Sequence, residues 1–184
     1  LQDVGLAVYV LPDPVTLDDM YANLRTVAAL TGHVAEAETA ITALRARVAS
    51  VTEKTAAVAE RPLVFYELDS TDPNAPWTAG PGTFLDMLIQ MSGGDNVGAT
   101  LEGAWAQISV EKLVVDNPDI IVLGDSAYGA SPETVAARAG WGALTAVQNN
   151  AIYDFDDNLV SRPGPRLVDG LEAMARLLHP ELFE

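Results

Sequence analysis

The chain has 184 residues, a net charge of -16 at neutral pH and no cysteine. With 49% hydrophobic residues it is expected to be a folded globular protein rather than a disordered one. The negative charge repels phosphate backbones and anionic membrane surfaces, which argues against nucleic-acid binding. The lack of cysteine excludes disulfides and thiolate chemistry, and it suits an exported protein as well as a cytosolic one.

No apolar run approaches the length needed to span a bilayer, and no signal peptide is visible. The first residue is Leu1 rather than methionine. We therefore expect a trimmed chain, with any export signal lying upstream.

The start of the chain predicts a strand followed by two helices. Residues 4–11 (VGLAVYVL) read as a short buried strand that needs neighbours in a sheet. Thr16 is a suitable cap for a helix that ends at Gly32. Residues 34–60 predict one long helix, because apolar or small residues recur at alternating spacings of four and three, without an internal Gly or Pro. Pro62 would end this helix.

Two interpretations of the long helix are open at this point. It could be half of a coiled coil, although its apolar stripe is rich in Ala and Thr and short of Leu. It could instead be a strut that joins two lobes, with an α/β unit at each end.

The rest of the chain alternates between strands and helices. Strands are predicted at 63–68, 120–124 and 151–155, and helices at 83–91, 109–116, 141–147 and 167–178, with irregular segments at 69–82 and 95–108. A further helix is predicted to open at 131–133, with proline at its first position. This order predicts an α/β fold with a mainly parallel sheet and helices on both faces. Ligands of such sheets bind at the carboxyl ends of the strands, which here are the loops 69–82, 124–129 and 156–166.

The sequence contains few residues or motifs that are typical of an enzyme active site. It has no Cys nucleophile, no G-x-S-x-G elbow and no His/Asp/Glu cluster with metal-ligand spacing. His33 and His179 lie at helix ends, where a histidine is more often a partner of the helix dipole than a catalyst. The helix start at 79–83 could hold an anion, but Pro81 removes one N–H donor.

Aromatic residues and arginines in the edge loops are more informative. Several aromatic rings at one sheet edge would suit a large, flat, partly apolar ligand. Arg162 and Arg166 flank a rigid Pro-Gly-Pro turn and could bind carboxylate or phosphate groups, or could pair with nearby aspartates at 156, 157 or 169. The aromatic candidates are Tyr66, Trp77, Trp105 and Tyr128.

Glu111 is predicted to be exposed in the first turn of a helix capped by Ser109. The simplest explanation is a favourable charge at the positive end of the helix dipole.

Three stretches together resemble a known family: TAGPGTFLDMLIQMSGGDN (78–96), ISVEKLVVDNPDIIVL (108–123) and SRPGPRLVDGL (161–171). They are similar to the iron-siderophore/cobalamin (Fe/B12) class of periplasmic substrate-binding proteins of ABC importers, the type with a helical backbone (class III). The resemblance implies two α/β lobes joined by one rigid helix. Residues 1–33 would be the end of the first lobe, 34–61 the interlobe helix, and 62–184 the C-terminal α/β lobe.

The same resemblance implies roles for single residues. Glu111 matches the glutamate that docks on an arginine of the ABC permease. Trp77, Trp105 and Tyr66 match aromatic positions of the ligand cleft, and the loop with Arg162 and Arg166 faces that cleft in several members.

The implied function is extracytoplasmic binding of a ferric siderophore, a corrinoid such as cobalamin, or haem, without an intrinsic cofactor, in a periplasm or on a lipid anchor at a cell surface. The lack of histidine clusters argues against the related carriers of bare zinc and manganese ions. The alternatives are an α/β enzyme for an anionic substrate near 80–83 and the two arginines, or a sensor or scaffold that kept the fold. An open edge on the first strand would also favour self-association.

Overall fold

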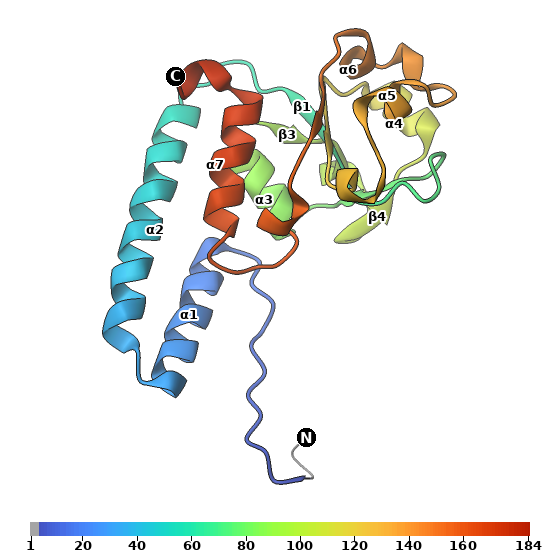
Figure 1. The fold of residues 1–184 in the computed structure, drawn as a ribbon. Helices are drawn as coiled ribbons and strands as arrows, with labels where there is room; N and C mark the ends of the chain where they lie inside the picture. The colour runs from blue at the N-terminus through green and yellow to red at the C-terminus, as the bar shows by residue number, and fades with distance from the viewer. Residues whose placement is uncertain (1–3) are drawn as a thin grey trace.

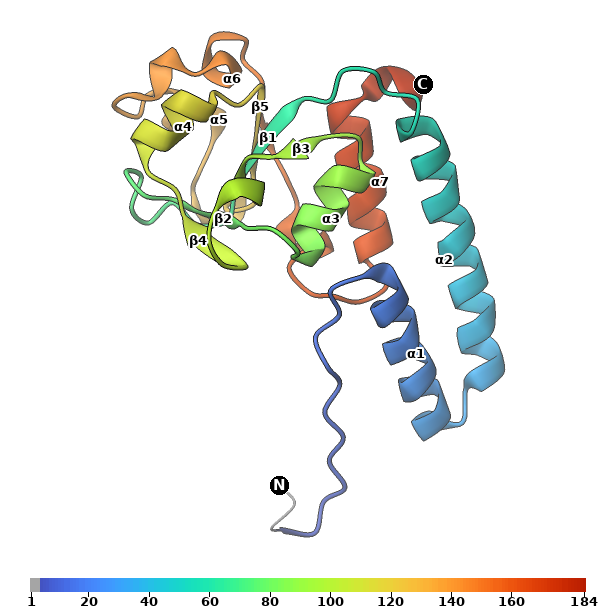
Figure 2. The same cartoon turned by 180° about the vertical axis from the view of Figure 1, so that it is seen from behind.

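A four-stranded parallel sheet organises the computed structural model of the chain, which describes residues 4–184. Its strand order is β3-β1-β5-β6, and helices cover both faces (Figures 1 and 2). The predicted α/β fold with a parallel sheet is therefore confirmed. The strands are β1 (Leu63–Glu67), β3 (Asp95–Asn96), β5 (Ile120–Leu123) and β6 (Ile152–Asp154).

Side chains of the central strands alternate between two cores, because successive residues of a strand point to opposite faces. Val64 and Tyr66 of β1 pack with Val122 of β5 in one core. Phe65 of β1 packs with Ile121 of β5 and others in the second core. Both faces are apolar because both are covered, as is typical of parallel sheets.

Two layers of helices supply the other half of each core. The first core is covered by α3 (Phe84–Met91) and α7 (Leu167–Leu178). The second is covered by shorter elements: α4 (Val110–Asp116), α5 (Pro132–Ala136) and α6 (Thr145–Gln148), together with the buried ring of Trp141. The predicted helix at 141–147 is divided, since Trp141–Ala143 forms a 3₁₀ turn before α6.

The two N-terminal helices lie outside the sheet (Figure 1). α1 (Leu17–Thr31) begins with a capping box, in which Thr16 and Asp19 bond to each other's backbone N–H, and ends at Gly32 in the left-handed conformation. α2 (Val34–Thr55) packs against α1 and α7, and Arg47 pairs with Asp169 and Glu172 of α7. None of the helices within residues 4–184 combines the length and apolar character needed to cross a membrane.

The predicted end of the long helix was wrong, since α2 stops at Thr55 rather than Glu60. The Thr55 hydroxyl donates to the carbonyl of Met91 at the end of α3, at 2.8 Å, and its side chain is buried. This contact holds the end of α2 beside α3. The following residues leave the helix so that the chain can cross to β1.

The predicted strand at 4–11 was also wrong. Val4 and Gly5 lie in a turn, and residues 6–11 have no regular secondary structure. Large apolar side chains such as Val4 and Val10 are 75% and 81% exposed. A strand needs a hydrogen-bonded neighbour, and no other described strand lies beside this segment.

A two-stranded antiparallel ribbon crosses segments that were predicted to be irregular. β2 (Trp77–Ala79) pairs with β4 (Trp105–Gln107). Its geometry depends on a close backbone approach, because a Cβ on Gly80 would lie 1.9 Å from the carbonyl oxygen of Gly103. The ribbon therefore requires glycine at position 80.

Candidate functional site

Two neighbouring cavities open where β1, β5 and β6 end. The larger, about 940 Å³, lies between the loops after β5 and β6. The smaller, about 550 Å³, lies between the loops after β1 and β5. Both are lined by Tyr128, Gly129 and Ala130. This is the edge at which parallel α/β sheets bind ligands, so the predicted loops do meet at one place.

Tyr128 stands between the two cavities with 89% of its surface exposed. It ends the 3₁₀ turn Ser126–Tyr128, and Gly129 follows with a φ of 108°, a conformation that strongly favours glycine. The short turn therefore projects an aromatic ring into solvent at the cavity mouths. Such a ring is available to a flat ligand.

Trp77 and Trp105 lie on the β2–β4 ribbon, 42% and 44% exposed. The register pairs Trp77 with Gln107 and Ala79 with Trp105, so the two indoles lie on one face of the ribbon as diagonal neighbours. The indole of Trp105 packs edge-to-face on Phe84, with ring centroids 5.7 Å apart. Trp77 also forms a β-bridge with Asp69, which lines the smaller cavity.

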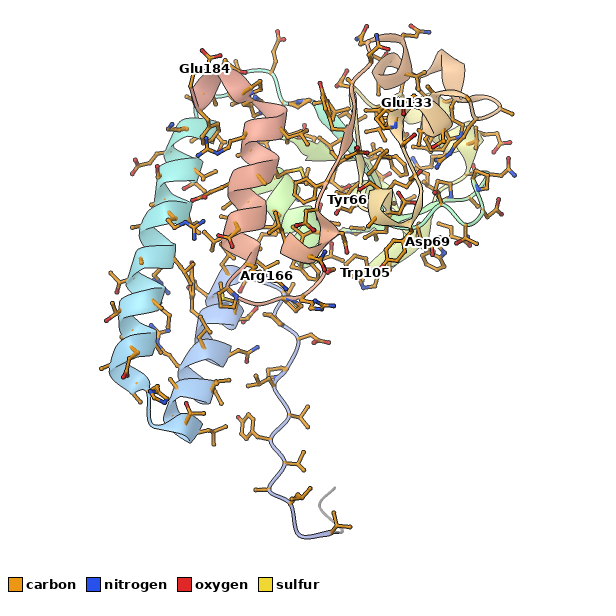
Figure 3. The ribbon with its side chains drawn as sticks, in the orientation of Figure 1. Tyr66, Asp69, Trp105, Glu133, Arg166 and Glu184 are labelled. Atoms are coloured by element: carbon orange, nitrogen blue, oxygen red, sulfur yellow. The ribbon has the colours of Figure 1, made fainter. Side chains whose placement is uncertain are left out.

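Figure 3 shows Asp69, Trp105 and Arg166 along the same border of the C-terminal α/β unit, whereas Glu133 lies away from it. The structure thus brings the ribbon that carries the two predicted tryptophans and the predicted arginine loop to the same side of the sheet.

Tyr66 occupies a different position from the other aromatic candidates, since its side chain has no exposed surface. Its hydroxyl donates to Asp157 at 3.1 Å. Burial, together with the nearby Asp157, raises the pKa of its phenol. Tyr66 lies under the loop after β6, and direct contact with a ligand stays a prediction. Gly124 allows this placement, because a Cβ there would lie 2.5 Å from the Tyr66 ring.

Arg162 and Arg166 are both exposed, and Arg162 lines the larger cavity. Within residues 4–184 neither guanidinium forms an ion pair. The three aspartates considered as partners have other contacts. Asp157 accepts a hydrogen bond from Tyr66, and Asp156 accepts one from Asn158. Asp169 forms an ion pair with Arg47. The alternative in which these arginines pair with neighbouring aspartates is therefore wrong.

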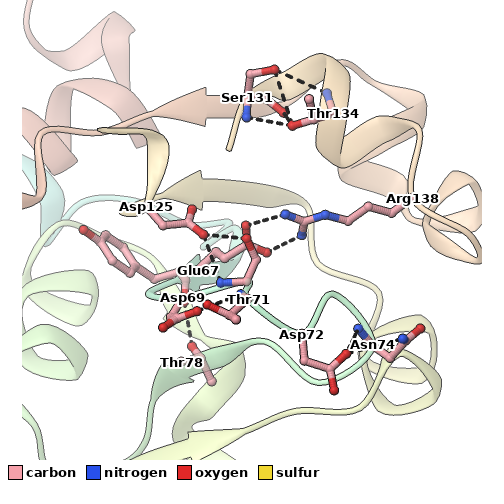
Figure 4. Close-up of polar contacts among 12 residues, drawn as sticks. Glu67, Asp69, Thr71, Asp72, Asn74, Thr78, Asp125, Ser131, Thr134 and Arg138 are labelled. Atoms are coloured by element: carbon pink, nitrogen blue, oxygen red, sulfur yellow. Dashed lines mark hydrogen bonds and ion pairs between the residues drawn. The ribbon is translucent and has the colours of Figure 1, made fainter. Parts of the chain in front are cut away.

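A buried ion pair lies behind the smaller cavity (Figure 4). Glu67, at the end of β1, has no exposed surface and accepts two hydrogen bonds from Arg138, one of them at 2.9 Å. The Arg138 guanidinium also lies over the Trp141 ring, 4.6 Å from its centroid. Burial raises the pKa of the Glu67 carboxyl, while the bonds from Arg138 oppose this rise.

Asp125 lies two residues after the end of β5 and lines the smaller cavity, with only 5% of its surface exposed. Its Oδ2 accepts from the Ser70 hydroxyl at 2.6 Å and from the Ser70 backbone N–H at 3.0 Å. Its Oδ1 is buried and has no hydrogen-bond partner among residues 4–184. The site therefore holds an acceptor whose hydrogen-bonding capacity is unused.

Glu111 is exposed in the first turn of α4, as predicted, and the Ser109 hydroxyl caps this helix by accepting from the Lys112 N–H. Val114 and Val115 follow at the spacings of three and four that share a helix face. They are 39% and 81% exposed. An acidic residue and two apolar side chains thus form one free surface, which we call the α4 face.

The remaining candidates have local roles. At the start of α3, the Thr83 hydroxyl accepts from the Asp86 N–H, and Asp86 accepts from the Gly82 N–H. These donors are therefore already used. His179 is buried with its Nε2 3.1 Å from the Gly93 carbonyl, while His33 is exposed beside Glu36. Within residues 4–184 no group of three or more acidic or histidine side chains is placed to hold a metal ion.

Sequence reasoning missed Asp125 and the pair of Glu67 and Arg138. The signal for the aspartate was present, because a Gly-Asp step directly follows a buried strand. No signal pointed to the ion pair, whose members are 71 positions apart.

Residues 1–159 match the family described as "Periplasmic binding protein". The chain belongs to the periplasmic binding protein family. This periplasmic binding protein is 30% identical, over its whole length, to the ABC transporter substrate-binding lipoprotein YvrC of Bacillus subtilis, of which it covers 57%. It is 28% identical to a cobalamin-binding protein of Halobacterium salinarum, with 97% of the chain and 49% of that protein aligned. It thus spans about half the length of these relatives.

The fold agrees with this membership. A crystal structure described as a possible iron-binding (periplasmic solute-binding) protein of Staphylococcus epidermidis superimposes with a TM-score of 0.84 at 25% identity, covering 97% of this chain and 68% of the other. The predicted resemblance to substrate-binding proteins of ABC importers is confirmed.

Proposed function

We propose that this periplasmic binding protein captures a metal chelate outside the cytoplasm and delivers it to an ABC importer. The observation that carries the proposal is the sheet edge, where two adjoining cavities lie beside exposed aromatic rings. Large apolar rings with few fixed polar groups suit a corrin, porphyrin or siderophore chelate. The similarity to a cobalamin-binding protein supports a ligand of this kind.

The proposal divides the chain as the resemblance implied. Residues 62–184 form the ligand-binding α/β lobe, residues 34–61 the connecting helix, and residues 1–33 belong to the partner lobe. In support, α2 packs on α7 along one part of its length and on α1 along another. A location in a periplasm or on a lipid-anchored surface is part of this proposal, and the lipoprotein relative supports it.

The α4 face is the proposed docking surface for the permease. Glu111 would pair with an arginine of the permease, and the exposed Val114 and Val115 would pack beside that ion pair. Charge complementarity sets partner choice at such surfaces, and apolar contacts that exclude water strengthen it.

Tryptophan fluorescence of the full-length protein tests ligand capture. Saturable quenching is expected with one chelate among cobalamin, haem, a ferric hydroxamate and a ferric catecholate. Because each indole would contact the ligand ring, Trp77→Phe and Trp105→Phe are each expected to raise the Kd about 2- to 10-fold. Trp141 is completely buried in the second core and provides a reference emitter.

Free tryptophan corrects these titrations for the light that the chelates absorb. Flat corrected curves with all four chelates would overturn the proposed function and leave the fold assignment intact. A Kd that stays at the wild-type value in both Phe variants would instead contradict the role of the β2–β4 ribbon.

We also infer that residues 4–11 allow the chain of 184 residues to associate with a second copy. The segment is apolar, exposed and without strand partners among the described residues, and an unpaired backbone of this kind is available for pairing with another chain. Sedimentation velocity should show an average mass that rises with concentration, and Val8→Lys/Val10→Lys should reduce this rise. A strictly monomeric profile at high concentration would contradict the inference.

A further inference from the structure

The two cavities are unevenly charged. Five carboxylates line them, against two arginines. One of the arginines, Arg138, donates to the buried Glu67 and is therefore already neutralised. Arg162 is left as the single unpaired cation among the described lining residues. The five carboxylates are those of Asp69, Asp125, Asp154, Asp156 and Asp157.

The rest of the chain adds to the negative electrostatic field in the two cavities. Hydrogen bonds from Thr71 lower the pKa of Asp69, so this carboxylate is ionised at neutral pH. The whole chain carries a charge of -16, which gives little opposing field. A cleft lined by one sign of charge concentrates ligands of the opposite charge, repels those of the same sign and leaves neutral ligands unhindered.

The side chains that line the two cavities also offer mainly hydrogen-bond acceptors. An ionised carboxylate only accepts hydrogen bonds. Asp125 Oδ1 is unpartnered, and the Asp154 carboxylate accepts no hydrogen bond from any residue in 4–184. A ligand that fills the smaller cavity must bring an N–H or O–H donor to Asp125, because a buried acceptor without a donor costs free energy. The exposed Asp154 carboxylate is open to a donor from a ligand in the larger cavity.

We infer that the ligand is an amide-bearing chelate without net negative charge, which means a corrinoid or a ferric hydroxamate rather than haem or a ferric tris-catecholate. Amide groups supply the N–H donors that the carboxylates require. Haem carries two carboxylates and a ferric tris-catecholate three negative charges, and both present acceptors. Arg162 can meet one phosphate, as a corrinoid has, within an overall neutral ligand. This inference rests on the proposed function and specifies its ligand class.

Isothermal titration of the full-length protein with four probes tests the inference: cyanocobalamin, ferric desferrioxamine, haem and ferric enterobactin. One of the first two should bind most tightly, and which of them binds distinguishes the corrinoid from the hydroxamate. Only the cationic hydroxamate complex should lose affinity as salt rises, since screening weakens charge attraction.

A charge-removal variant, Asp154→Asn/Asp156→Asn/Asp157→Asn, is expected to bind ferric enterobactin at least about tenfold tighter than the wild type does. Asparagine keeps an acceptor oxygen, so the bonds from Tyr66 and Asn158 can persist. The matched control is Glu36→Gln/Glu53→Gln/Glu60→Gln, which removes the same charge from exposed positions on and beyond α2. This control should change affinity less than about twofold.

The single variant Asp154→Asn guards against misfolding, because this exposed side chain makes no hydrogen bond within residues 4–184. It should move the affinity for ferric enterobactin in the same direction by a smaller factor. Tightest binding of haem or ferric enterobactin by the wild type would overturn the inference while the proposed function stands. An equal gain in the control triple variant would also overturn it, whereas a failure of all four probes to bind would overturn the proposed function itself.

Discussion

Replacing Arg138 with leucine is expected to lower the free energy of unfolding at pH 7 by about 3–5 kcal/mol, because it leaves a buried carboxylate without its partner. Glu67 has no exposed surface and lies at the end of the central strand β1. Its carboxylate accepts two hydrogen bonds from the one guanidinium that the variant lacks. Urea unfolding followed by circular dichroism measures the loss.

This loss should depend on pH in one direction. The pKa of Glu67 is already raised above its ordinary 4.5 by burial, and removal of Arg138 raises it further. In the variant, the folded state then holds the Glu67 proton more tightly than the unfolded state does. The protonated carboxyl therefore costs no stability below its ordinary pKa, and stability is lost as pH rises through the pKa of the folded state. The difference between variant and wild type should therefore shrink as pH is lowered from 7 toward 4.5.

The control for this experiment is Arg25→Leu. Arg25 pairs with Glu38 between α1 and α2, but both side chains are about half exposed, at 46% and 48%. Exposed pairs contribute little to stability because solvent screens them, so this variant should hardly change the urea midpoint. A deficit in Arg138→Leu that matches this control, or that is the same at every pH, would show that the buried pair does not hold the end of β1.

Under the proposed function, Glu111→Ala should reduce transport of the chelate at limiting concentration at least about tenfold, while ligand affinity stays unchanged. Truncating one member of an interfacial charge pair costs about 2–5 kcal/mol of binding when the pair is desolvated. Glu111 is exposed and makes no side-chain hydrogen bond within residues 4–184, so its loss should leave the fold intact. Uptake by membrane vesicles that contain the importer measures the transport rate.

Glu133→Ala is the matched control. Glu133 is likewise an exposed glutamate in the first turn of a helix that a serine caps, but it lies on α5. Normal transport by Glu111→Ala would contradict the docking role. An equal defect in both variants would show that the permease responds to acidic charge in general rather than to the α4 face.

Sequence patterns predicted the long regular elements well, because each depends on local information. α7 begins and ends where its apolar spacing predicts, at Leu167 and Leu178. Thr16 and Ser109 cap helices as their residue types suggest. The apolar run of β5 correctly indicated a strand covered on both faces.

Elements that depend on distant partners could not be predicted in this way. The ribbon strands β2 and β4 have three residues each and pair across 26 or more positions, so neither carries a periodic signal of its own. Residues 4–11 show the reverse case, since a strong β pattern forms no strand without a neighbour. The end of α2 at Thr55 is set by a contact with Met91 in another helix.

The site was predicted in outline and not in detail. The rule for parallel sheets placed the loops at one edge, and the exposed tryptophans and arginines lie there. The burial of Tyr66 depends on Gly124 and on the loop that carries Asp157. Such contacts arise only once three segments of the chain have met.

The packing of α2 has a mechanical consequence. Arg45 bonds to Asp18 of α1, whereas Arg47, two positions later, bonds to α7, so the helix is clamped from both sides near its middle. It has no internal glycine or proline at which helices usually bend, and its length is about 33 Å. A movement at one end is passed on as a rigid tilt, and a tilt of about 5° displaces the other end by about 3 Å. This stiffness limits how far α1 moves relative to the sheet. Under the proposed function, the bound ligand and the side chains around it, rather than a large change in shape, would distinguish a loaded protein from an empty one.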